Sequence, residues 1–236
     1  MSEACRSGRL PAGGCGNPFR SHTGSVFPMS VPAREPFTPE GALALLQAGH
    51  ERFLAGTPRR PHTDFERRDA LAEQQHPMAA VLGCSDSRVP VELLFDTDFG
   101  DLFVARNAGN VALAGMVGTL EYAVAVLQVP LIVVLGHERC GAVAAALRPQ
   151  NLDLLPSSLA QLVGQIRLEM LAAGIEGDLD RACRHNALRA AQHLASASVL
   201  INESLVSGKL RIEAARYDLD DSRLDWLGSV APRSGA

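Results

Sequence analysis

The chain has 236 residues, 47% of them hydrophobic, and a formal net charge of −4 at pH 7. This length and composition suit one globular domain with a sizeable core, with or without a loose tail. The basic residues are interspersed with acidic ones and form no stripe that would neutralise phosphates, so nucleic acid is not an expected partner. The most apolar stretch, 116–135, is interrupted by Glu121, Gln128 and Pro130, so no membrane span is expected.

Cysteine usage indicates the compartment. The chain has five cysteines, Cys5, Cys15, Cys84, Cys140 and Cys183. An odd and sparse set is a poor disulfide framework, and it suits a reducing compartment where thiolates bind metals or stay free. No apolar segment typical of a secretory signal follows the N-terminus. We therefore expect a cytoplasmic protein.

The first part of the chain differs from the rest. Residues 1–36 are rich in Gly, Pro, Ser and Arg and have no apolar periodicity. Such a segment buries too little surface to offset its ordering entropy, so a disordered N-terminal extension is expected. It is either a tail or weak targeting sequence, or else translation starts at Met29, which is the favoured interpretation. The folded domain is expected over 37–228, with a C-terminal tail over 229–236.

Local signals predict alternating helices and strands. Thr38 can cap a helix whose first position is Pro39, and the Gly-Thr-Pro stretch at 56–58 ends it. Short apolar runs bounded by Gly, Pro or Asp predict strands at 77–83, 102–105, 131–135 and 211–217. Helical patterns cover 115–127, 159–170 and 180–207, and Gly208 stands where a C-terminal cap belongs. The alternation favours an α/β domain with a mainly parallel central sheet flanked by helices.

Two of the predicted strands end in residues that bind metals. Ligands of open α/β sheets gather at the carboxyl ends of the strands. Cys84 follows the strand at 77–83, and His137 and Cys140 follow the strand at 131–135. Adjacent parallel strands would bring the three donors together, and two cysteines with one histidine are typical of catalytic zinc with an open position. Alone, each residue is more commonly structural, as a small buried side chain or a turn residue, so the conjunction carries the prediction.

Asp86 and Arg88 accompany the first cysteine. Zinc with two thiolates and a neutral imidazole is formally neutral, and Asp86 as fourth ligand would close the site. Arg88 could instead hold Asp86 in an ion pair, which at ~4 Å is worth about 4 kcal/mol at an effective dielectric constant of about 20. The carboxylate would then orient a zinc-bound water, whose pKa zinc lowers to about 7. Thiolates weaken this acidification, so activity should rise toward alkaline pH. A turn-capping salt bridge is the alternative.

These residues lie in segments that resemble β-class carbonic anhydrases. CSDSRV at 84–89 and HERCGAV at 137–143 resemble the two signatures of that family. The intervening blocks also resemble it, namely GDLFVARNAGN at 100–110, LEYAV at 120–124 and PLIVVLGH at 130–137. The likeness spans about 39–219, most of the expected domain. It implies reversible hydration of CO2 to bicarbonate and a proton, by attack of zinc-bound hydroxide.

The resemblance also implies roles by matched position. One Zn²⁺ per chain would be bound by Cys84, His137 and Cys140, with Asp86 as a switchable ligand paired with Arg88. The substrate pocket of the plant-like subgroup would include Gln75, Phe103, Tyr122 and Gly141. That pocket is divided between two chains, so a homodimer or homotetramer is implied. Alternatively, the two aromatic residues belong to the core and Gln75 is an ordinary polar residue at a helix end.

Three other functions remain open. Enzymes that resemble this family hydrolyse COS or CS2 with the same zinc ligands, and the sequence says little about pocket access. A zinc-binding sensor module without turnover is disfavoured, because a structural site prefers four permanent ligands to an Asp86–Arg88 pair. A cysteine hydrolase is disfavoured because two cysteines beside one histidine suit a metal better than a nucleophile.

Overall fold

The computed structural model describes residues 37–60, 65–148 and 154–233. The extension expected over 1–36 and the last three residues of the expected tail lie outside these described residues. The domain boundaries therefore stay predictions.

A five-stranded sheet forms the centre of the described chain, in the order β2-β1-β3-β4-β5. The strands are β1 (Ala79–Cys84), β2 (Leu102–Asn107), β3 (Leu131–His137), β4 (Arg211–Tyr217) and β5 (Leu224–Ser229). The first four run parallel, and β5 pairs antiparallel with β4 at one edge. The predicted mainly parallel α/β architecture is confirmed.

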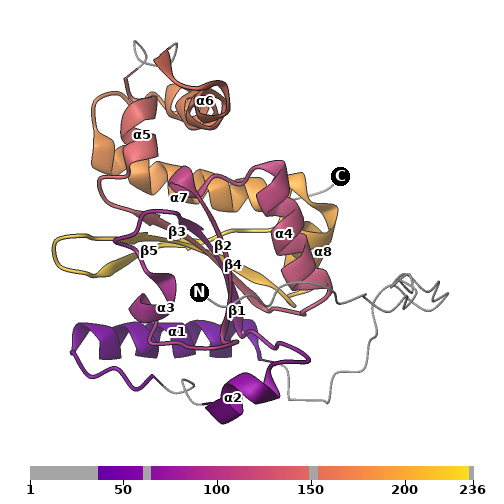
Figure 1. Ribbon diagram of the computed structural model, residues 1–236. Coiled ribbons are helices and arrows are strands. Elements are labelled where there is room, and N and C mark those ends of the chain that lie inside the picture. Colours follow the sequence, from indigo (N-terminus) through magenta and orange to yellow (C-terminus); the bar gives the residue numbers. More distant parts are fainter. Residues whose placement is uncertain (1–36, 61–64, 149–153, 234–236) are drawn as a thin grey trace, which may run out of the picture. The chain divides into compact units, whose positions relative to one another are not determined.

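Helices cover both faces of this sheet. Figure 1 shows α1 (Pro39–Leu54) and α3 (Val91–Leu94) on one face, and α4 (Ala114–Ala125), α7 (Leu179–Ala197) and α8 (Val199–Val206) on the other. Alternate residues of β1 serve the two layers, since Ala80 and Leu82 pack toward α4 and α7 while Ala79 and Val81 pack toward α1. Burial on both faces explains why the inner strands are continuously apolar.

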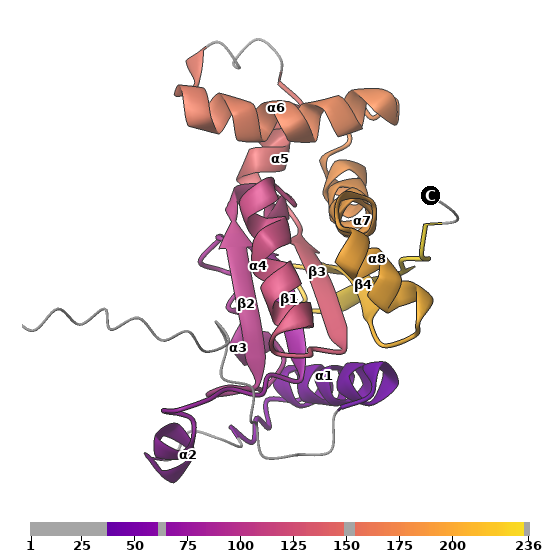
Figure 2. The ribbon, with the colours of Figure 1, turned by 90° about the vertical axis from the view of Figure 1, so that its right-hand side faces the viewer.

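Shorter elements complete the domain. They are α2 (Phe65–Ala70), the 3-10 helix η1 (Ala108–Asn110), α5 (Gly141–Ala146) and α6 (Ser157–Ala172). Figure 2 shows α6 lying across α5, beyond one end of the strands. None of the described helices is both long enough and apolar enough to cross a membrane.

Most predicted elements are confirmed, and one is wrong. Thr38 caps α1 by accepting a hydrogen bond from the Gly41 amide at 3.0 Å. The single helix expected over 180–207 is instead two helices, because Ser198 adopts an extended backbone with φ −125° and ψ 118°. Its hydroxyl accepts a hydrogen bond from the Ile201 amide at 3.2 Å and so starts α8. Gly208, with φ +69°, follows α8 as expected.

Candidate metal centre

The ends of two neighbouring strands bring the three predicted donors together. Cys84 is the last residue of β1 and His137 the last of β3, and these strands are parallel neighbours. Arg139 has a left-handed φ of +51°, which turns the chain so that Cys140 comes back toward them. The three ligand atoms lie within 4.8 Å of one another, and the two sulfurs are 4.0 Å apart. All three residues are buried.

The histidine presents one nitrogen to the sulfurs. His137 Nδ1 lies 2.8 Å from the Glu138 carbonyl oxygen, so Nδ1 carries the proton and donates it there. In the neutral imidazole Nε2 then has a free lone pair, and this buried atom has no hydrogen-bond partner. An unpartnered buried nitrogen is costly unless something binds it. The arrangement is typical of a metal-binding imidazole whose second nitrogen is fixed by a backbone carbonyl.

The two thiols influence each other strongly. The hydrogen bond with Cys140 lowers the pKa of Cys84, against the effect of burial. The same contact, together with burial, raises the pKa of Cys140. One thiolate therefore forms easily, and the second needs a nearby positive charge such as a divalent cation. Two sulfurs and an imidazole nitrogen fit zinc, which takes such ligands in tetrahedral sites.

Asp86 lies beside the donors but is held by Arg88. The Arg88 side chain donates to both carboxylate oxygens, at 3.0 Å from Nε to Oδ1 and 2.7 Å from Nη2 to Oδ2, and its backbone amide donates to Oδ1 at 2.9 Å. These hydrogen bonds keep the pKa of Asp86 far below its usual range. Asp86 Oδ2 is 3.8 Å from His137 Nε2. The predicted ion pair is thus present. Asp86 is not one of the three grouped donors, so it does not occupy the fourth ligand position.

Arg106, which sequence reasoning did not single out, fixes the turn that carries Cys84 and Asp86. From β2, its Nε donates to the Cys84 carbonyl at 2.8 Å and its Nη2 donates to the Asp86 carbonyl at 2.7 Å. Both carbonyls are therefore held by one rigid guanidinium. The available signal was a charged residue at the end of an otherwise apolar strand.

The pocket residues implied by the resemblance are only partly brought together. Phe103 on β2 and Tyr122 on α4 are neighbours, with ring centroids 6.0 Å apart. Tyr122 is 40% exposed, whereas Phe103 is partly buried and packs against the core cluster of the sheet and α4. Gln75, in the stretch before β1, and Gly141, the first residue of α5, are exposed. Their roles in binding substrate stay predictions.

A second group of possible ligands is better explained by ion pairs. Glu138, Asp218 and Asp220 also bring carboxylate oxygens within 4.8 Å of one another. Arg139 pairs with Asp220 at 2.7 Å, and Arg216 pairs with Asp218 at 2.7 Å. Arginines therefore compensate these charges.

Comparisons with known proteins agree with this geometry. The family model described as carbonic anhydrase matches residues 79–224. The "Carbonic anhydrase 2" of Mycobacterium tuberculosis is 39% identical over 198 residues, which cover 81% of this chain and 96% of that protein. The carbonic anhydrase of Mycolicibacterium smegmatis is 39% identical over 190 residues, or 79% of this chain and 92% of that one.

Solved structures give the same result for the fold. A tetrameric β-carbonic anhydrase from the ascomycete Sordaria macrospora aligns with a TM-score of 0.62 and 26% identity, over 80% of this chain and 98% of that one. The β-carbonic anhydrase CcaA aligns with a TM-score of 0.62 and 26% identity, over 80% and 99% of the two chains. The family-model match over residues 79–224 includes both segments that supply the sulfur and nitrogen donors.

Proposed function

The chain belongs to the β-carbonic anhydrase family, and on this premise we propose that it catalyses the reversible hydration of CO2 to bicarbonate and a proton. One zinc ion would be bound by Cys84, His137 and Cys140. The observation that carries the proposal is the convergence of three buried donor atoms within 4.8 Å, beside a carboxylate that an arginine restrains.

The side chains around the three donors would have separate roles in the reaction. When bound, zinc would lower the pKa of a coordinated water to about 7 and so supply a nucleophile near neutral pH. Asp86 can accept a hydrogen bond from the attacking water. This hydrogen bond would direct the lone pair of the water oxygen toward CO2. Arg88 keeps that carboxylate ionised and in place with two side-chain hydrogen bonds. Arg106 holds the backbone that positions Cys84 and Asp86.

Stopped-flow CO2 hydration over a pH series, with metal analysis of the same sample, tests this proposal. We expect one zinc per chain and activity that rises toward alkaline pH, because two thiolates donate more charge to the metal than neutral imidazoles do. A flat or acid-favouring profile, or full activity without metal, would contradict the mechanism.

Parallel assays test the alternative functions. Hydrolysis of COS and CS2 should be slower than hydration of CO2. Stoichiometric zinc without turnover of any of them would favour the sensor module.

A homodimer or homotetramer is also part of the proposal. The relative from Sordaria macrospora is described as tetrameric, and the Phe103–Tyr122 pair lies on an edge strand and its covering helix with Tyr122 partly exposed. Light scattering of the full chain should give the mass of two or four chains. A fully active monomer would show that Gln75, Phe103, Tyr122 and Gly141 do not need a second chain to bind substrate.

A cytoplasmic location remains a proposal that rests on cysteine chemistry. Among the described residues, Cys84, Cys140 and Cys183 are free thiols rather than disulfides. Zinc-binding thiolates need a reducing compartment to stay available.

A further inference from the structure

A backbone amide from η1 contacts one of the metal-binding sulfurs. The Gly109 N–H donates a hydrogen bond to Cys84 Sγ over 3.3 Å, inside the protein. Gly109 has φ +77°, and a Cβ at this position would lie 2.8 Å from Ile166 Cδ1 and 3.1 Å from Ala142 Cβ. Only glycine suits such a backbone and so little space. Because residue 109 has no side chain, the orientation of its amide depends on contacts from other residues.

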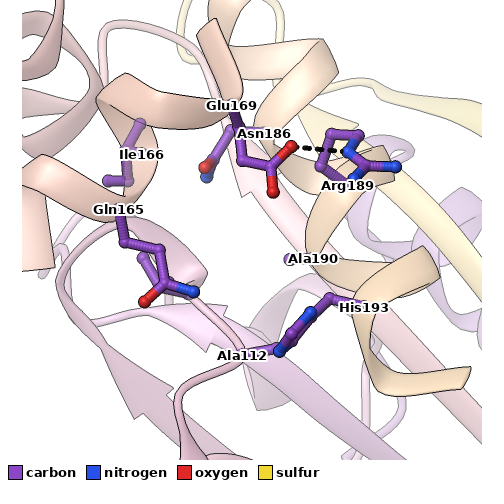
Figure 3. Close-up of a pocket in the computed structure, with 9 residues that line it drawn as sticks. Ala112, Gln165, Ile166, Glu169, Asn186, Arg189, Ala190 and His193 are labelled. Atoms are coloured by element: carbon purple, nitrogen blue, oxygen red, sulfur yellow. Dashed lines mark hydrogen bonds and ion pairs between the residues drawn. The ribbon is translucent and has the colours of Figure 1, made fainter. Parts of the chain in front are cut away.

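A buried amide side chain on α7 holds Gly109 from the other side. Asn186 Nδ2 donates to the Gly109 carbonyl oxygen at 2.7 Å, and Asn186 is only 4% exposed. The buried side of α7 otherwise consists of apolar residues and one cysteine, so this polar residue stands out. Figure 3 shows Asn186 on the wall of a narrow pocket between α6 and α7, beside the ion pair of Glu169 with Arg189.

We propose that Asn186 is a positioning residue of the metal centre, which keeps the Gly109 amide directed at the Cys84 sulfur. A hydrogen bond to a thiolate withdraws charge from the sulfur, and a fixed donor pre-organises the ligand before metal binds. Asn186 thereby controls two properties of the site, the affinity for the metal and the charge that Cys84 donates to it. The inference rests on the metal binding proposed above.

Ser198 supplies a matched control. It lies just beyond the last turn of the same helix, about 18 Å along the axis from Asn186 at 1.5 Å per residue. It is 2% exposed, and its hydroxyl donates a partly buried hydrogen bond to Glu121 at 2.6 Å. Ser198→Ala therefore removes this hydrogen bond and the one that the hydroxyl accepts from the Ile201 amide, and neither involves Gly109.

The test compares the wild-type chain with Asn186→Ala, Asn186→Leu and Ser198→Ala. Each metal-free protein is titrated with zinc in competition with a chelator, and the absorption spectrum is recorded after loading with Co²⁺. We expect both Asn186 variants to raise the zinc dissociation constant by about 10-fold, the lower end of the loss for a direct partner of a ligand, because Asn186 acts through Gly109. Their cobalt–thiolate charge-transfer band should move to longer wavelength, because a sulfur that lacks its hydrogen bond gives up charge more easily. Ser198→Ala should change neither property.

The outcomes separate this inference from the proposed function. If the Asn186 variants keep the wild-type zinc affinity and an unshifted cobalt–thiolate band, the inference is wrong but the proposed function stands. The same holds if Ser198→Ala loses as much zinc affinity as the Asn186 variants. If Asn186→Ala does not fold, Asn186→Leu decides, because it keeps the branched shape of the side chain and leaves no cavity. A wild-type chain with neither stoichiometric zinc nor a cobalt–thiolate band would overturn the metal centre itself.

Discussion

Cys84→Ser is expected to remove stoichiometric zinc and to lower CO2 hydration by more than about 100-fold, since even partners of ligands cost 10- to 100-fold when lost. Serine keeps the shape of the side chain, but its hydroxyl stays protonated near neutral pH and is a poor zinc ligand. The change also replaces the sulfur that accepts the Gly109 hydrogen bond and lies 4.0 Å from Cys140 Sγ. Elemental analysis and stopped-flow rates on one sample measure both effects.

Cys183→Ser is the matched control for this prediction. Cys183 is a buried free thiol in the same apolar cluster as Cys84 and Cys140, and burial raises its pKa. It does not belong to the three-donor group, so the variant should keep its zinc and most of its activity. Loss of activity in Cys84→Ser with zinc fully retained would contradict the metal mechanism and favour a cysteine nucleophile.

Arg88→Leu is expected to lower CO2 hydration by about 100-fold or more while zinc stays bound, because a correctly held acid–base group is commonly worth 10²–10⁴-fold. Without the guanidinium, the Asp86 carboxylate loses two hydrogen bonds and is free to turn toward the metal ligands, only 3.8 Å from His137 Nε2. A carboxylate bound to zinc would occupy the position that water needs. Arg88→Lys keeps the charge but not the two-point contact, so an intermediate rate is expected.

Arg223 offers a control with the same spacing in the sequence. It pairs with an aspartate two residues earlier, Asp221, at 3.5 Å, a longer contact than the 2.7 Å between Arg88 and Asp86. Arg223 is 73% exposed, and exposed ion pairs contribute little to stability. Arg223→Leu should therefore keep the wild-type rate. If Arg88→Leu is equally active, or if it loses zinc as fully as Cys84→Ser, the proposed restraint of Asp86 is wrong.

Local sequence signals were sufficient for the scaffold and for the metal donors. Cys84 and His137 stand at the ends of continuously apolar runs, and such runs with helices between them form neighbouring parallel strands. The convergence of the donors followed from that topology, and the Asp86–Arg88 pair followed from proximity in the chain and opposite charge. The cap at Thr38 and the end at Gly208 were also correct, because each signal lies within a few residues.

Local signals failed where a residue acts on a distant partner. Ser198 lies within a helical pattern in the sequence, yet it ends α7 and caps α8, and its hydroxyl also donates to Glu121 of α4, which the fold brings near. The antiparallel edge strand β5 and the short helices α2, α3 and α5 were not predicted, since tertiary contacts stabilise elements of this length.

The sequence by itself determined the α/β class, the donor residues Cys84, His137 and Cys140, and the acid–arginine pair beside them. Only the tertiary structure decided how these groups are held, through Arg106 on the Cys84 and Asp86 carbonyls and through Asn186 on Gly109. The physical reason is that these contacts join side chains to backbone groups about 20 to 80 positions away. Their partners are defined by the packing of β2 and α7 rather than by any pattern along the chain.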